Sequence, residues 1–211
     1  IIDTFSSRTF VSVKESGAVG DGSNDDTAAI QAALNSGEPV YLPAGTYRIT
    51  STLNITINGT KMHGAGRTSL QTRIAPANAT MNAIRVAAQF AEVAHLEIWP
   101  LQIQTAGYAV VFEFPAFYAA LDNVFIHHCF NAVLMNNGTE TRINRVALRA
   151  LYGWAGIHMT GTVGSGTYRA ILCDLSCDNP YPLPLAADPG AWTPNTSYAV
   201  GQTVHVGGAV Y

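Results

Sequence analysis

Short runs of alternating apolar and polar residues recur along the middle of the chain and can be aligned with one another. The first kind of run occurs four times, with offsets of 28, 22 and 29 residues, at 93–99, 121–127, 143–149 and 172–178. A second kind precedes each of them, with offsets of 26, 23 and 24 residues, at 82–86, 108–112, 131–135 and 155–159. A period of two is typical of β-strands, and a repeat of this length predicts a solenoid of stacked coils.

The alignment gathers apolar residues into four columns that we expect to point into the solenoid. The columns are Leu96, Val124, Val146 and Leu175; Ile98, Ile126, Leu148 and Cys177; Ile84, Val110, Val133 and Ile157; and Val86, Phe112, Met135 and Met159. A helical repeat would show a period of about 3.6 residues, and an antiparallel sandwich would not repeat one strand type in register. We therefore predict an all-β fold, a parallel β-helix.

The N-terminal segment predicts a loop and a short helix that close one end of this solenoid. Residues 11–13 alternate as a short strand, and three glycines within 17–22 allow a tight loop with positive φ. Asn24, Asp25 or Asp26 can cap the alanine-rich helix that follows, and Gly37 ends that helix. Two strands separated by a Pro-Gly turn follow within 40–49.

The same segment resembles a known family. GAVGDGSNDDTAAIQAAL followed by VYLPAGTYRI is similar to the opening segment of pectate-lyase-superfamily right-handed β-helices, over residues 10–66. Polygalacturonase-like enzymes, alginate epimerases and bacteriophage tailspikes share this pattern. The resemblance implies a right-handed β-helix, in which Asp21, Asp25 and Asp26 shape the loop and cap the helix. Clustered carboxylates can also hold a metal or act as acid and base, which is the alternative.

Composition and charge narrow the function classes. The 211 residues include 11 Lys and Arg and 14 Asp and Glu, a net charge of −3, so we expect no nucleic-acid partner. The charged fraction is 12 %, against about 25 % in average soluble domains. A surface with so little charge is compatible with burial in an oligomer. There is no apolar run of about 18 residues that would predict a membrane span.

Cysteines and chain boundaries add less. We expect Cys129, Cys173 and Cys177 to be small core residues, with a Cys173–Cys177 disulfide as the alternative. No Cys or His residues have the spacing of a zinc site, so we expect no structural metal. The chain begins at Ile1 and stops within an alternating run, so we expect a piece of a longer polypeptide. We expect five segments: a leader or connection at 1–10, the β-helix cap at 11–66, coils at 67–178, a linker at 179–190 and a truncated module at 191–211.

That last segment resembles the start of a chitin-binding-type carbohydrate-binding module. Its aromatic and glycine spacing is W-x5-Y-x2-G-x2-V-x6-Y. The resemblance makes three aromatic residues candidates for sugar contact, namely Trp192, Tyr198 and Tyr211. The alternative is that they form a small core of their own.

Alternation also predicts which side chains point outward from the coils. They form three sets: His95, Asn123, Arg145 and Asp174; Glu97, Phe125, Ala147 and Ser176; and Trp99, His127, Arg149 and Asp178. Aromatic platforms beside planar polar groups bind sugars, so we expect carbohydrate contact at Trp99, His127 and Arg149. An ordinary solvated surface is the alternative.

A catalytic centre is harder to place. Glycoside hydrolysis needs a pair of carboxyl groups, and Asp174 and Asp178 on one strand are the nearest approach to such a pair. A lyase would use a base such as Arg145, beside Asp174, with calcium held by carboxylates as its cofactor; otherwise we expect no cofactor.

Three function hypotheses follow. The first is a virion tailspike or tail-fibre component, located in the virion tail or outside the cell, that contacts a cell-surface polysaccharide, either by binding alone or as a depolymerase. Outward-facing Val111, Leu134 and Phe125 suggest contact with another chain, and tailspike β-helices form side-by-side trimers, so a homotrimer with other tail proteins as partners is expected. The second is a free pectate-lyase-like or polygalacturonase-like enzyme. The third is a non-catalytic structural spike domain.

Overall fold

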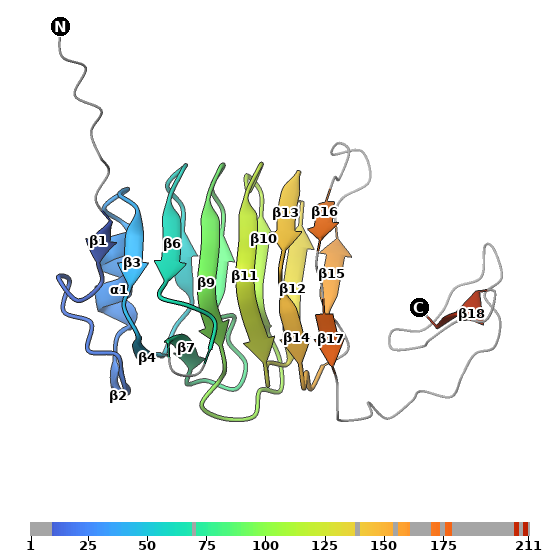
Figure 1. Ribbon diagram of the computed structural model, residues 1–211, viewed down its shortest axis with the longest axis horizontal. Helices are drawn as coiled ribbons and strands as arrows, with labels where there is room; N and C mark the ends of the chain where they lie inside the picture. Colours follow the sequence, from blue (N-terminus) through green and yellow to red (C-terminus); the bar gives the residue numbers. More distant parts are fainter. Residues whose placement is uncertain are drawn as a thin grey trace, which may run out of the picture.

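The computed structural model describes residues 10–68, 71–137, 140–153, 156–160, 170–173, 176–178, 205–206 and 209–210. Its strands form a β-solenoid of about six turns, with the coils lying side by side along the molecule (Figure 1). Every strand pairing within the solenoid is parallel; an antiparallel pair, β18 (His205–Val206) with β19 (Ala209–Val210), lies outside it. The predicted all-β parallel β-helix is confirmed.

The strands line three faces. The first face contains, in spatial order, β1 (Val11–Ser12), β3 (Val40–Leu42), β6 (Lys61–Gly64), β9 (Glu92–Ile98), β11 (Ala120–His127), β13 (Thr141–Asn144) and β16 (Ala170–Cys173). The second contains β2 (Asp21–Asp25), β4 (Gly45–Ile49), β7 (Thr72–Pro76), the C-terminal halves of β9 and β11, β14 (Ala147–Arg149) and β17 (Ser176–Asp178). The third contains β5 (Leu53–Ile55), β8 (Ile84–Val86), β10 (Tyr108–Glu113), β12 (Asn131–Asn136) and β15 (Ile157–Thr160).

The predicted columns are observed as register partners. On the third face Val110 pairs with Ile84 and with Val133, and Phe112 pairs with Val86 and Met135. On the other faces the partners are Leu96 with Val124, Ile98 with Ile126, Ile126 with Leu148, and Leu148 with Cys177. The column residues from 84 to 148 are buried in one continuous apolar core. The offsets counted in the sequence therefore predicted these registers correctly, but Met159, which pairs with Met135 and was expected to point inward, is 47 % exposed.

Strict alternation fails where β9 and β11 turn from the first face to the second. His95, Asn123 and Arg145 occupy equivalent places in successive coils, and each has a positive φ, of 57°, 52° and 52°. The chain changes direction at this left-handed residue, which breaks the alternation between Val93 and Leu96, and beyond it the alternation resumes with Leu96 and Ile98 in the core. Glu97 and His127, predicted to face solvent, do lie on the outer side of these strands, but they are buried, with 1 % and 6 % exposure, because they contact each other and Trp99 packs against His127.

Another outward prediction also needs correction. Val111, whose outward position suggested contact with another chain, is buried within this chain. Leu134 and Phe125 are half-buried. Val111 therefore gives no support for a partner chain, and Leu134 and Phe125 give less support than the sequence suggested, because each exposes only part of its surface.

The N-terminal end is covered as predicted by a short helix, α1 (Thr27–Leu34), which packs its Ile30, Ala33 and Leu34 against the core. Asp26 is the N-cap residue, but its buried carboxylate accepts hydrogen bonds from the loop amides of Val19 (2.5 Å) and Gly20 (3.0 Å). The segment expected to be only a loop contains strand β2, which pairs with β4 across a register shift.

Candidate functional site

A cluster of aromatic and histidine side chains lies on the second face, where its strands end. Trp99 follows β9, His127 ends β11, His128 comes next, and Tyr152 follows β14. Parallel strands in register bring the ends of successive coils together, which is why residues about 25 positions apart meet here. Arg73 of β7 comes from the preceding coil, where it pairs in register with Glu97.

The rings of this cluster are closely packed. The Trp99 ring centroid lies 4.3 Å from that of His127 and 5.4 Å from that of His128, and Tyr152 lies 6.0 Å from His128. The Arg73 guanidinium lies 4.2 Å from the Trp99 ring centroid, and Arg73 Nε donates a hydrogen bond to the Trp99 carbonyl oxygen at 3.1 Å. Cation–π contact and this hydrogen bond fix the orientation of the indole.

Beneath the rings lies a hydrogen-bonded series of titratable groups. His127 Nε2 is 2.7 Å from Glu97 Oε1, and His127 Nδ1 is 3.1 Å from His128 Nδ1. Glu97 Oε2 is buried and has no hydrogen-bond partner. An acid held in this way is costly, because a buried carboxylate oxygen normally has a donor. Burial, together with His127, Arg149 and Arg73, lowers the pKa of His128.

A groove of about 210 Å³ opens over this cluster. Its lining combines the cluster with the turn after β9, namely Trp99, Pro100, Leu101, Gln102, Ile103, His128 and Tyr152. Leu101 and Ile103 are exposed apolar side chains at its rim. Aromatic and apolar walls with a few polar groups are typical of a site that binds a ring such as a sugar.

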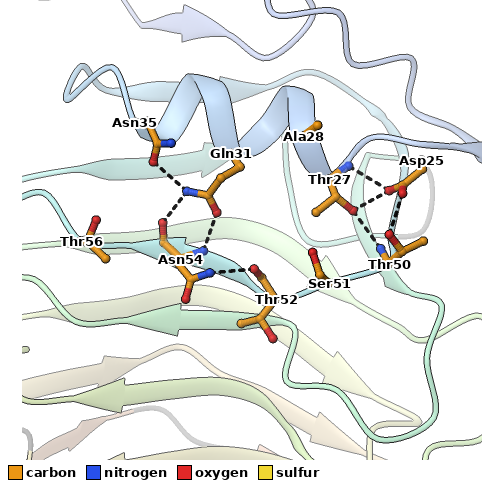
Figure 2. A pocket seen from close by; sticks show the side chains of 10 residues that line it. All are labelled: Asp25, Thr27, Ala28, Gln31, Asn35, Thr50, Ser51, Thr52, Asn54 and Thr56. Atoms are coloured by element: carbon orange, nitrogen blue, oxygen red, sulfur yellow. Dashed lines mark hydrogen bonds between the residues drawn. The ribbon is translucent and has the colours of Figure 1, made fainter.

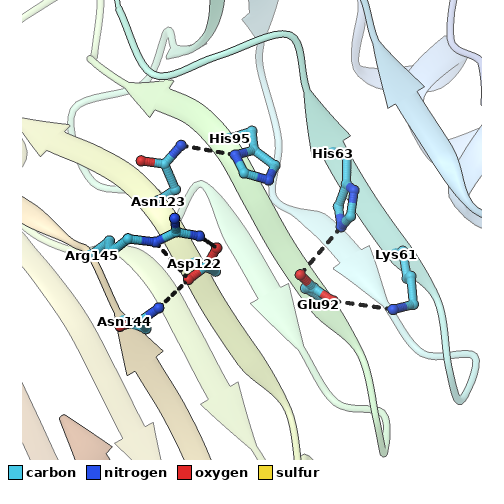
Figure 3. A network of polar contacts seen from close by, with 8 residues as sticks. All are labelled: Lys61, His63, Glu92, His95, Asp122, Asn123, Asn144 and Arg145. Carbon is cyan, nitrogen blue, oxygen red and sulfur yellow. Dashed lines mark hydrogen bonds and ion pairs between the residues drawn. The ribbon is translucent and has the colours of Figure 1, made fainter. Parts of the chain in front are cut away.

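A second polar network occupies the first face and contains the predicted catalytic Arg145 (Figure 3). Arg145 Nη2 forms an ion pair with Asp122 Oδ2, and Asn144 Nδ2 donates to Asp122 Oδ1 at 2.6 Å. Burial acts to raise the pKa of Asp122, but these hydrogen bonds hold that pKa below its ordinary value. Arg145 therefore has an aspartate partner other than the predicted Asp174.

The same network continues toward the N-terminus. Lys61 Nζ lies 3.2 Å from Glu92 Oε2, and His63 Nε2 lies 3.4 Å from Glu92 Oε1, a separation that suits ionic attraction better than a well-formed hydrogen bond (Figure 3). His63 and then Lys61 stabilise the charged form and lower the pKa of Glu92 to about 2, although burial acts in the opposite direction.

A cleft of about 560 Å³ lies between α1 and the start of the third face, and it contains the predicted cap residue Asp25 (Figure 2). Asp25 Oδ1 accepts hydrogen bonds from the backbone and hydroxyl groups of Thr27, and Gln31 binds both backbone groups of Asn54 on the edge strand β5. These bonds close the helix start and the sheet edge, so the polar groups of the cleft have structural partners.

The three cap aspartates thus have separate structural contacts. Asp21 Oδ1 accepts from the amides of Ser23 and Asn24, which lower the pKa of Asp21, while Asp25 binds Thr27 and Asp26 binds the loop. Within the described part of the chain, no group of three or more His, Cys, Asp or Glu side chains is placed to hold a metal ion.

The other candidates are divided between two situations. Arg149 is exposed beside the cluster and pairs in register with His127 and Asp178. Asp174, Trp192, Tyr198 and Tyr211, and the side chain of Asp178, lie outside the described residues, and so does most of the predicted C-terminal module. Those predictions stay predictions. In the described residues, no helix is long and apolar enough to cross a membrane.

Sequence reasoning missed several members of the cluster. Arg73 lies in a coil that precedes the aligned repeats, and Tyr152 lies in a turn, so neither belonged to a column. Glu97 was placed on the outer surface, and nothing in a single strand indicates that it meets a histidine 30 positions later. The one signal for this contact in the sequence was that Glu97 and His127 lie on aligned strands of adjacent coils.

Comparisons with known proteins agree with this architecture. Residues 10–100 match the family model described as rhamnogalacturonase A/epimerase, pectate lyase-like. The chain is 48 % identical over 56 residues to the pre-neck appendage protein of Bacillus phage B103, covering 26 % of this chain and 6 % of that protein. It is 58 % identical over 43 residues to mannuronan C5-epimerase AlgE3 of Azotobacter vinelandii, covering 18 % and 2 %. The chain thus matches less than a tenth of the length of either relative.

A solved structure extends the likeness beyond that segment. The Geobacillus virus E2 protein ORF18 superimposes with a TM-score of 0.55 and 19 % sequence identity, over 79 % of this chain and 41 % of that one. At this identity the comparison shows the fold. The chain is therefore a β-solenoid whose residues 10–100 match the pectate-lyase-like family.

Proposed function

We propose that this protein is a component of a phage tailspike or tail fibre, in the virion tail or outside the cell, that contacts a cell-surface polysaccharide through the groove over Trp99. The observation that carries the proposal is the groove itself. It presents a fixed indole, a tyrosine ring and exposed Leu101 and Ile103 on the outer surface of a solenoid. The phage appendage relative and the epimerase relative support the same proposal.

Binding to purified capsular and lipopolysaccharide preparations tests this proposal. Ile103 is 65 % exposed, so Ile103→Ala leaves the core intact and removes about three carbons from the groove wall. We expect its affinity to fall by about tenfold or less, and that of Trp99→Ala to fall further. The matched control is Phe114→Ala, because Phe114 is equally exposed, at 67 %, and does not line the groove.

The result decides between the candidate functions. The proposal is supported if the wild-type protein binds a preparation, both groove variants bind it more weakly, and the control variant binds it as well as the wild type. If no preparation binds, or if the groove variants bind as well as the wild type, the protein is a structural spike domain and the proposal is wrong.

A homotrimer is part of the proposal. Phe90 and Tyr118 stack with their centroids 5.2 Å apart, both are more than half exposed, and both have positive φ. Bulky residues seldom adopt that conformation, so two stacked aromatics there favour a surface that another chain covers. Light scattering after size exclusion should give three times the chain mass, and a monomeric mass at all concentrations would contradict this assembly.

A second candidate is a free polysaccharide-degrading enzyme of the pectate-lyase kind, with or without calcium. One observation favours it, the buried Glu97–His127 pair directly beneath the groove. Release of reducing ends or of unsaturated products by the soluble protein is the measurement that separates an enzyme from a binding component.

A further inference from the structure

The wall of the groove over Trp99 contains two aliphatic side chains that the fold leaves in solvent. Leu101 is 44 % exposed and Ile103 is 65 % exposed, and both line the groove together with the ring of Pro100. Large apolar side chains that gather in a concave surface mark a binding site, whereas single exposed ones are ordinary. The groove therefore offers an aliphatic contact area in addition to its aromatic rings.

The segment that carries these side chains is bonded to the preceding coil at several points. Three of its main-chain N–H groups donate hydrogen bonds to carbonyl oxygens of that coil, in the pairs Trp99 to Ile74 (3.0 Å), Leu101 to Pro76 (2.9 Å) and Thr105 to Ala79 (2.8 Å). Gln104, which is 2 % exposed, donates from Nε2 to the Met81 carbonyl oxygen at 3.3 Å. The wall is therefore preorganised, and a ligand covers Leu101 and Ile103 without first ordering the segment.

The lining of the groove is uncharged. In the part of the chain that the structure describes, no Asp, Glu, Lys or Arg side chain lines it, and its polar groups are those of Gln102, His128 and Tyr152. Burial chiefly lowers the pKa of His128, with His127 and two arginines adding to it, so the His128 imidazole is neutral near pH 7. Arg73 is outside the lining and donates from Nε and Nη2 to the carbonyl oxygens of Trp99 (3.1 Å) and Pro100 (3.3 Å). A sugar carboxylate would find no cation in this lining to pair with, and a neutral sugar needs none.

The size of the groove limits the ligand further. Its volume of about 210 Å³ is below the range of about 300–1,000 Å³ that is usual for drug-sized ligands, so it suits one sugar ring of a longer chain.

We propose that the groove selects a neutral sugar that carries a methyl group, an inference that rests on the proposed polysaccharide contact. The methyl group belongs to a 6-deoxyhexose or to the acetamido group of an N-acetylated amino sugar. One face of the pyranose ring lies against the aromatic side chains of the groove, and the methyl group lies against Leu101 and Ile103. A hydroxyl group in the same place would lose water without gaining a partner on this wall.

Pairs of sugars that differ at the methyl group test this selection. L-fucose has a methyl group where L-galactose has a hydroxymethyl group, and N-acetyl-D-glucosamine has an acetamido group where D-glucose has a hydroxyl group. In NMR titrations of the protein we expect the methyl-bearing member of at least one pair to bind about fivefold more tightly or better. In saturation-transfer NMR its methyl protons should receive the most saturation. D-glucuronic acid provides the charged comparison with D-glucose.

A pair of matched variants connects the preference to the wall. Ile103→Thr keeps the branched shape and replaces an ethyl group with a polar methyl-sized one, so we expect the preference to fall to about twofold or less. Phe114→Ala is the control, because Phe114 is 67 % exposed, as much as Ile103, and does not line the groove. This control should retain the full preference.

The pair that shows the preference identifies the source of the methyl group. A preference that Ile103→Thr reduces and Phe114→Ala retains supports the inference. Equal binding within both pairs, a preference that Ile103→Thr leaves unchanged, or tighter binding of glucuronic acid than of glucose overturns it, while the proposed polysaccharide contact stands. If none of the five sugars binds, the inference is also overturned, and the proposed function fails with it only if the capsular and lipopolysaccharide preparations do not bind either.

Discussion

Replacement of Asp26 should destabilise the N-terminal end of the solenoid far more than replacement of its neighbours. The Asp26 carboxylate is 1 % exposed and accepts two backbone hydrogen bonds, from Val19 at 2.5 Å and from Gly20 at 3.0 Å. In Asp26→Ala both amides lose a charged acceptor. Hydrogen bonds to charged groups contribute about 1.5–3 kcal/mol each, so we expect the free energy of unfolding to fall by about 3 kcal/mol or more.

Asp26→Asn provides a finer test of the same contact. An amide side chain offers one acceptor oxygen and places its NH2 group against the second backbone amide. We therefore expect Asn to restore no more than half of the stability that Ala removes. Asp21→Ala is the control, because Asp21 is exposed and binds only its own loop.

Denaturant unfolding followed by circular dichroism gives the overall loss, and amide hydrogen exchange at Val19 and Gly20 gives the local one. We expect both amides to exchange much faster in Asp26→Ala and to remain protected in Asp21→Ala. If the two variants share one unfolding midpoint, the carboxylate does not hold the loop, and the reasoning is refuted.

Two further predictions concern the coil network and the turns. The pKa of Glu92 is lowered to about 2, chiefly by His63, so Glu92 stabilises the fold above pH 4.5, and this contribution is lost as the pH falls from 4.5 toward 2. In Glu92→Gln the melting temperature should therefore depend less on pH over that range, and an equal pH dependence in the variant would argue against the contact. Gly107→Ala should unfold at a clearly lower denaturant concentration than Gly17→Ala. Both glycines have positive φ, but an added Cβ at 107 presses on the Met81 carbonyl, whereas one at 17 meets nothing within 4 Å; equal unfolding midpoints would count against the close approach of these coils.

The strand registers were accessible from the sequence because they depend on a repeated property. Val110 lies between Ile84 and Val133 because apolar side chains at equal positions in successive coils share one core. The offsets vary only where turns lengthen, and inserted residues there leave the columns unchanged. The N-terminal helix could also be predicted from the sequence, because a glycine-containing loop and capping acids stand directly before its alanine-rich run.

The site was less accessible because it depends on the places where that regularity ends. At His95 and Asn123 the chain adopts positive φ without glycine, and no simple pattern marks such a bend. Beyond the bend, Glu97 and His127 occupy the outward positions that alternation predicts, but they are buried against each other, and alternation alone says nothing about such a contact between coils. Arg145 was recognised as a polar site residue, but its Asp122 partner lies in the preceding coil and not on the strand that was examined for it.

The most direct test of the account is to map where a polysaccharide binds, by hydrogen–deuterium exchange of the protein with and without a bound ligand from the capsular and lipopolysaccharide panel. The account predicts protection of the backbone over 99–104 and around His128 and Tyr152, which line one groove. Protection confined to the cleft beneath α1, or to the Phe90 and Tyr118 surface, with no change over 99–104, would contradict it.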